Sequence, residues 1–294
     1  MRGVMSARSL SGRLLSLARS AILAFVILAL GQGVWGALLV ANLRTTTAVP
    51  WAVAVMPIVL WLMWRYLGGK WWPHRTSEAR RLCLRANGVS GPAWTWAILA
   101  GLLSIAALAG LWIVMFQLVR MPANILPDYA GYPLLTVVLV IAMASLVSPI
   151  TEESAFRGYC QAILEREFSG PLAVLISSVL FALAHLTQGF LWPKLLVYFL
   201  AGLVFGVIAN LTASILPGMV AHIVGDLTFF ALVWPYDPKR RLVWGRGADP
   251  WFWLHLAQAA AFTVLAILAF RRLAKVTQAG RRTRTNVPDL EQAS

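Results

Sequence analysis

Long uncharged apolar runs alternate along this chain with short segments that carry nearly all of its charge. Most runs are long enough to cross the roughly 30 Å hydrocarbon core of a bilayer as an α-helix, which satisfies its own backbone hydrogen bonds. The pattern therefore predicts an all-α, polytopic membrane protein with about eight transmembrane helices. The predicted spans are 21–43, 50–67, 94–119, 133–150, 171–187, 194–211, 214–233 and 251–270.

Composition supports the same class of protein. The 294 residues are 60% hydrophobic and 12% charged, whereas soluble domains carry about 25% charged residues. The net charge of +14 comes from basic residues beside the apolar runs, a placement typical of topogenic charge and of contacts with anionic lipids. We therefore expect lipids, and no nucleic acid, as partners. Cys83 and Cys160 provide neither a disulfide framework nor a CxxC metal motif.

The basic residues also predict the orientation of the chain. If eight spans alternate, the segments on the side of the N-terminus hold 18 of the 25 Lys and Arg residues. We therefore expect a multi-pass protein of the cell (plasma) membrane with both termini in the cytoplasm. The predicted divisions are a basic N-terminus at 1–20, a transmembrane bundle at 21–272 and a basic, disordered tail at 273–294.

Ionisable residues within or beside apolar runs indicate function, because a charge at membrane depth costs at least a few kcal/mol. Glu153 and Arg157 are four residues apart, so they share a helical face and can form a charge-assisted pair. Glu152 lies about 100° away around the same helix, without that partner. We predict that Glu153 and Arg157 are structural and that Glu152 is a base. Pro149 predicts a kink before them, and a helix end in the head groups is the alternative interpretation.

Phe181 and His185 have the same spacing on the next apolar run. A turn at 169–171, where Gly and Pro follow Ser, places Glu152 and His185 each about 25 Å from it. The two residues then lie at one depth of an antiparallel hairpin, where a carboxylate and an imidazole can share a water. A histidine on an apolar helix is otherwise more often a packed or hydrogen-bonded residue than a catalyst.

His222 and Asp226 form a third pair with this spacing. An aspartate that holds a histidine is also a common structural contact, so the pair alone decides nothing. Three such pairs on three separate segments favour an active site within the helical bundle.

At these residues the sequence resembles the CPBP intramembrane proteases (CAAX-processing and bacteriocin-processing, or Abi), which include the Ras-converting CAAX endopeptidases. The motifs of that family are EExxxR, FxxxH and HxxxN or HxxxD, and this chain has all three in that order. They cover about 150–230, within an expected protease core at about 133–234. The resemblance implies an intramembrane endopeptidase that hydrolyses a peptide bond of a membrane-associated or lipidated protein or peptide.

The resemblance also implies roles for single residues. Glu152 and His185 would activate the attacking water, while His222 and residue 226 would stabilise the oxyanion. An ionised Asp226 cannot donate a hydrogen bond, so it is expected instead to fix the tautomer of His222. Glu152, His185 and His222 could also bind Zn²⁺ with an open position for water. Since the chain has no HExxH pair, we favour a glutamate-type mechanism without a cofactor, with zinc as the alternative.

Two other functions compete with proteolysis. In a proton-coupled transporter, the same carboxylates and histidines would form a proton relay. Such transporters commonly contain internal repeats, and this sequence shows none. A catalytically silent membrane or immunity protein that keeps the fold is the other alternative.

Overall fold

The structure is a computed structural model, which describes residues 10–122 and 131–285. Within these residues the chain is helical and contains no strand, which confirms the predicted all-α class. The long helices are α1 (Leu10–Thr45), α2 (Trp51–Leu67), α4 (Gly91–Leu118), α5 (Leu134–Glu152), α7 (Gly170–Ala184), α8 (Trp192–Thr212), α9 (Leu216–Thr228) and α11 (Pro250–Thr285). The short helices are α3 (Ser77–Leu84), α6 (Gln161–Leu164) and α10 (Val243–Arg246).

Segments with other helical windings lie between them. The 3₁₀ segments are η1 (His74–Thr76), η4 (His185–Gln188) and η6 (Trp234–Lys239). The π-helical segments are η3 (Glu153–Cys160), which joins α5 to α6, and η5 (Phe229–Val233), which follows α9.

Seven stretches of the described chain are long and apolar enough to cross a membrane, so this is an integral membrane protein. They are 11–45, 91–118, 134–164, 170–188, 192–212, 216–245 and 250–280. The predicted span at 50–67 is the 17-residue α2, which rises roughly 25 Å and is therefore short for a bilayer core. The span predicted to end at residue 150 continues to Leu164, which places the first motif inside a membrane helix.

At both ends of the chain, helix extends beyond the predicted transmembrane bundle at 21–272. The segment predicted at 1–20 is helical from Leu10, and residues 1–9 lie outside the described part. The tail predicted to be disordered at 273–294 is helical as far as Thr285, and the last nine residues lie outside the described part. Ala, Gln, Lys and Arg favour helix, so they prolong a helix that the apolar span has already formed.

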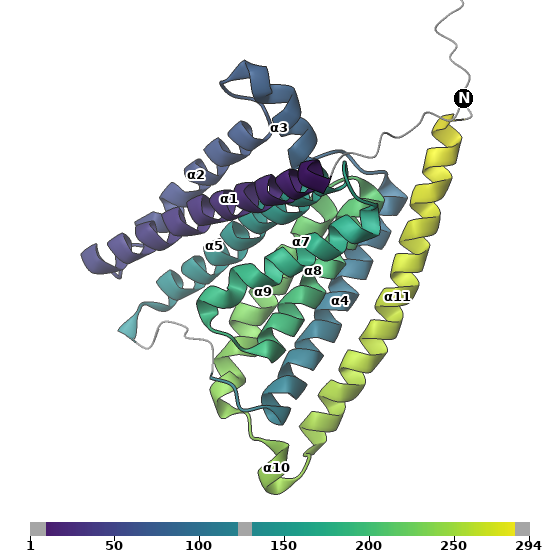
Figure 1. Cartoon of the computed structure of the whole chain (residues 1–294). Helices are drawn as coiled ribbons and strands as arrows, with labels where there is room; N and C mark the ends of the chain where they lie inside the picture. The colour runs from purple at the N-terminus through teal and green to yellow at the C-terminus, as the bar shows by residue number, and fades with distance from the viewer. Residues whose placement is uncertain (1–9, 123–130, 286–294) are drawn as a thin grey trace, which may run out of the picture.

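The helix α9 lies inside the bundle, between α4, α5 and α8 (Figure 1). Gly101 on α4 lets α4 and α9 approach closely, because a Cβ at this position would lie only 2.5 Å from the Ala221 Cβ on α9. The long α11 packs mainly on α4, whereas α1 lies across α5 and η3 on the other side. Polar groups of α9 therefore face residues from several helices.

Candidate active site

The first motif lies where α5 changes from α- to π-helical winding at Glu153. Pro149 lies inside α5, and the helix continues beyond it without ending there. The carbonyl groups of the π-helical segment accept bonds from other elements: Ser177 Oγ donates to Phe156 O at 2.8 Å, and Arg85 Nη2 donates to Arg157 O at 2.6 Å. These donors from α7 and the end of α3 contact the π-helical segment, a winding that is frequent at functional sites.

The predicted pair of Glu153 and Arg157 is present and buried. Arg157 Nη1 lies 3.2 Å from Glu153 Oε1, and both side chains are 1% exposed. The same glutamate oxygen lies 2.9 Å from His222 Nδ1, a contact that spacing along the sequence did not predict. The Arg157 guanidinium also lies 4.1 Å from the centre of the Phe181 ring, in cation–π geometry. Glu153 therefore joins α9 to the first motif.

Glu152 has more partners than the sequence predicted. Ser148 Oγ donates to its Oε1 at 2.8 Å, and Gln32 Nε2 on α1 lies 3.5 Å from the same oxygen. Its other oxygen lies 3.7 Å from His222 Nε2. Glu152 is thus held by its own helix, by α1 and by α9, and it is only 6% exposed.

His222 lies between three carboxylates. Its Nδ1 faces Glu153, while its Nε2 lies 3.4 Å from Asp226 Oδ1 in the predicted pair and 3.7 Å from Glu152. The ring of Phe205 stacks on it, with ring centres 4.4 Å apart. Because an ionised carboxylate only accepts hydrogen bonds, His222 can serve these partners through both nitrogens only as an imidazolium.

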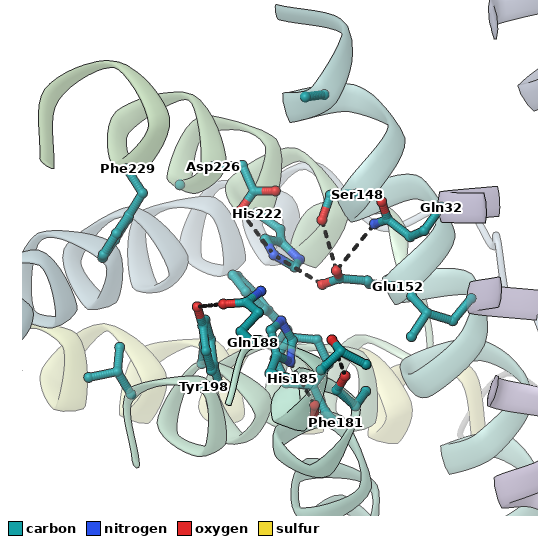
Figure 2. Close-up of a pocket in the computed structure, with 18 of the residues that line it drawn as sticks. Gln32, Ser148, Glu152, Phe181, His185, Gln188, Tyr198, His222, Asp226 and Phe229 are labelled. Atoms are coloured by element: carbon teal, nitrogen blue, oxygen red, sulfur yellow. Dashed lines mark hydrogen bonds and ion pairs between the residues drawn. The ribbon is translucent and has the colours of Figure 1, made fainter. Parts of the chain in front are cut away.

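His185 has a different environment. Its Nδ1 lies 2.9 Å from the Phe181 carbonyl oxygen and must donate there, because a carbonyl only accepts. In the neutral ring Nε2 is then an acceptor. The Tyr198 ring stacks on His185 with ring centres 3.9 Å apart and an angle of 22° between the planes (Figure 2).

These residues surround one pocket of about 710 Å³. Glu152, His185, His222 and Asp226 all line it, as does Phe181, whereas Glu153 and Arg157 lie behind its wall. Most of the wall is apolar, with contributions from α1, α4, α5, α7, α8, α9 and η5. The structure thus brings the three predicted pairs together around one cavity.

The polar residues at this pocket that were not predicted include Gln32, Ser148, Gln188 and Tyr198. Gln32 could have been identified from the sequence, because it is an isolated amide within the apolar run 21–43. The other three resemble ordinary polar residues near helix ends, and only their positions in the fold distinguish them.

The ligand set considered for zinc is not assembled in this structure. Among the residues that the structure describes, no three His, Cys, Asp or Glu side chains form a group that could hold a metal ion. Both nitrogens of His222 already face carboxylates, and His185 Nδ1 binds a backbone carbonyl. The preference for a mechanism without metal stays a prediction.

Comparison with known proteins bears on the same region. Residues 134–228 match the family model for type II CAAX prenyl endopeptidases, Rce1-like. The matched stretch begins with α5 and ends with α9, so it contains all three motifs. No curated protein and no solved structure matches the chain.

Proposed function

We propose that this chain is an intramembrane protease of the CPBP family, because its residues 134–228 match the Rce1-like family model. The protein is an endopeptidase that hydrolyses a peptide bond of a membrane-anchored or lipidated protein or peptide. One observation carries this proposal: the Glu152 carboxylate lies at the wall of a largely apolar pocket that two histidines also line.

Glu152 is the general base of the reaction. It takes a proton from a water molecule, whose oxygen then bonds to the carbon of the scissile carbonyl to form a tetrahedral intermediate. When the C–N bond breaks, that proton passes to the leaving amine, and the products are a carboxylic acid and an amine. Ser148 and Gln32 orient the carboxylate through its Oε1.

His185 assists through its Nε2, the acceptor of the neutral ring, and binds the same water. His222 carries positive charge beside the Glu152 carboxylate, where it stabilises the negative oxygen of the intermediate. Glu153 and Asp226 hold His222 in place from either side. The role given to each of these residues is a proposal for this chain, which is based on the family motifs and supported by the contacts at the pocket.

The family name and the walls of the pocket support the proposed substrate class. The matching family is described as prenyl endopeptidases, which act on protein chains that carry an apolar lipid. A pocket with walls of aromatic and aliphatic side chains suits such a substrate, because apolar surface transferred from water contributes about 25 cal/mol per Å². Anionic lipids are the other expected partners, given the net charge of +14.

The test is cleavage of a membrane-tethered reporter by purified protein. Glu152→Gln keeps the shape of the side chain but removes its basicity, so turnover should fall by about 10²-fold or more. His185→Ala should do the same, and the double variant should be little worse, because residues that act as a unit are not additive. Glu78→Gln, at an exposed glutamate of α3, is the matched control and should be fully active.

Normal cleavage by well-folded Glu152→Gln protein would refute the glutamate base. Cleavage by neither the wild-type protein nor any variant would instead favour a proton relay or a catalytically silent membrane protein.

A further inference from the structure

Two neutral polar side chains of the pocket have no part in the chemistry described so far. Tyr198 Oη, on α8, donates a hydrogen bond to Gln188 Oε1 at 2.8 Å. Both residues line the pocket beside His185, on which the Tyr198 ring stacks. One tyrosine therefore contacts an amide through its hydroxyl group and a histidine of the second motif through its ring (Figure 2).

Local backbone geometry places Gln188 beside His185. The two are the first and last residues of the 3₁₀ segment η4. Residues three apart in a 3₁₀ helix eclipse one another, so both side chains project from the same side of the turn. Gly189 then ends the segment with φ at +94°, a conformation that only glycine adopts without strain. The turn thus presents the amide and the imidazole to the pocket together.

The orientation of the Gln188 amide decides what it can offer to a ligand. Because its oxygen accepts from Tyr198, its NH₂ group is the end that donates. The other neutral donors near Glu152 already serve that carboxylate, since both Ser148 and Gln32 face it. Asp226, when ionised, accepts only. A donor for a carbonyl oxygen is therefore supplied by Gln188 and not by residue 226.

We propose that Gln188 donates a hydrogen bond to the oxygen of the scissile carbonyl and that Tyr198 positions both Gln188 and His185. The proposal rests on the peptide-bond hydrolysis proposed above. As negative charge develops on that oxygen in the tetrahedral intermediate, the bond from the amide strengthens, so the contribution of Gln188 lies mainly in the transition state. Tyr198 is a positioning residue, which acts through the amide and the imidazole.

The experiment measures kcat and KM of four variants on the membrane-tethered reporter. Gln188→Ala should lower kcat by at least about 10-fold and change KM by less than about threefold, as expected for a donor used in the transition state. Tyr198→Phe keeps the ring on His185 and loses only the hydroxyl group, so it should match Gln188→Ala. The double variant should be no slower than either single one. Tyr198→Leu should be slower still, because His185 also loses its stacking partner.

Matched controls separate this role from a merely structural one. Tyr236→Phe and Gln278→Ala change exposed residues that do not line the pocket, and both should keep wild-type kcat. Gln188 is exposed as well, so its variant should keep the wild-type melting temperature.

The outcomes distinguish this proposal from the proposed function. Wild-type kcat in Gln188→Ala would overturn the role of Gln188 while Glu152→Gln remains inactive and the protease assignment stands. Multiplicative losses in the double variant would overturn the positioning role of Tyr198. Slow Gln188→Ala together with active Glu152→Gln would support Gln188 and refute the glutamate base. Wild-type protein that cleaves nothing would overturn both proposals.

Discussion

At the scale of single residues, the site depends on how its buried charges are stabilised. Arg157 is 1% exposed, and neither of its Nη atoms has a hydrogen-bond partner within the described residues. Its charge is stabilised by the nearby Glu153 carboxylate and by the face of the Phe181 ring. This contact gives Phe181 a physical role, which its spacing from His185 did not reveal.

The first prediction concerns this buried pair. Arg157→Ala leaves Glu153 charged at low dielectric, and Glu153→Ala does the same to Arg157, so each should lower the free energy of unfolding by about 3–5 kcal/mol. Thermal unfolding in detergent measures the effect. Glu152→Gln, which leaves the pair intact, should unfold near the wild-type temperature. Wild-type stability of both alanine variants would contradict the structural role of the pair.

The second prediction concerns metal. We expect activity to survive exhaustive chelation, and we expect purified protein to contain much less than one zinc ion per chain, because the set Glu152, His185 and His222 is not assembled as ligands. Metal analysis beside the reporter assay measures both quantities. Activity that returns only when zinc is added, with stoichiometric metal lost in His185→Ala, would show that a metal site forms after all.

At the scale of elements, short segments outside the bundle hold the helix that bears Glu152. Arg85, at the end of α3, donates to the Arg157 carbonyl of η3 and forms an ion pair with Glu165 just after α6. Burial lowers the pKa of its guanidinium, while the Glu165 carboxylate acts in the opposite direction. A buried cation next to a carbonyl of the π-helical segment fixes α3 against the helix that bears Glu152.

The third prediction concerns the packing of α1 on α5. A Cβ at Gly31 would overlap the Thr151 side chain, next to the Gln32–Glu152 contact. Gly31→Ala should therefore push α1 outward, lower stability by about 1–3 kcal/mol and reduce turnover as Gln32 leaves Glu152.

Gly36→Ala is the matched control on the same helix, because nothing lies within 4 Å of a Cβ there. It should have wild-type stability and turnover. Equal behaviour of the two alanine variants would show that the close approach of α1 to α5 does not position Glu152. The readouts are thermal unfolding and the reporter assay.

At the scale of the whole molecule, the arrangement of the helices agrees with an even number of crossings. Figure 1 shows the start of α1, the short α3 and the end of α11 at one end of the bundle, with α10 at the other. The short α2 must return the chain across the membrane for this arrangement to hold, and its 17 residues are at the lower limit of the length that spans a bilayer.

The fourth prediction is the orientation in the membrane. Cys83 and Cys160 are buried, so a single exposed cysteine introduced elsewhere reports accessibility. Lys239→Cys, in a loop predicted to lie outside, should react with a membrane-impermeant maleimide in intact cells, whereas Lys70→Cys should react only after permeabilisation. The reverse pattern would invert the topology, and labelling of both in intact cells would show that α2 does not cross.

The sequence by itself determined the membrane class, most of the helices and the residues of the three motifs. It could do so because apolar runs report bilayer thickness and because a helix places residues four apart on one face. Both rules depend only on the helix itself, so they hold whatever the helix packs against. The pair of Glu153 and Arg157 and the pair of His222 and Asp226 are therefore visible in the printed sequence.

Only the tertiary structure decided which partners those residues have. Glu153 meets His222 across 69 residues and Glu152 meets Gln32 across 120, while Tyr198 stacks on His185 from the next helix. These contacts depend on the rotation and crossing of helices in contact, which are set by side-chain packing over the whole interface. For the same reason Glu152, which was predicted to lack Arg157 as a partner, is held from three helices around a common pocket.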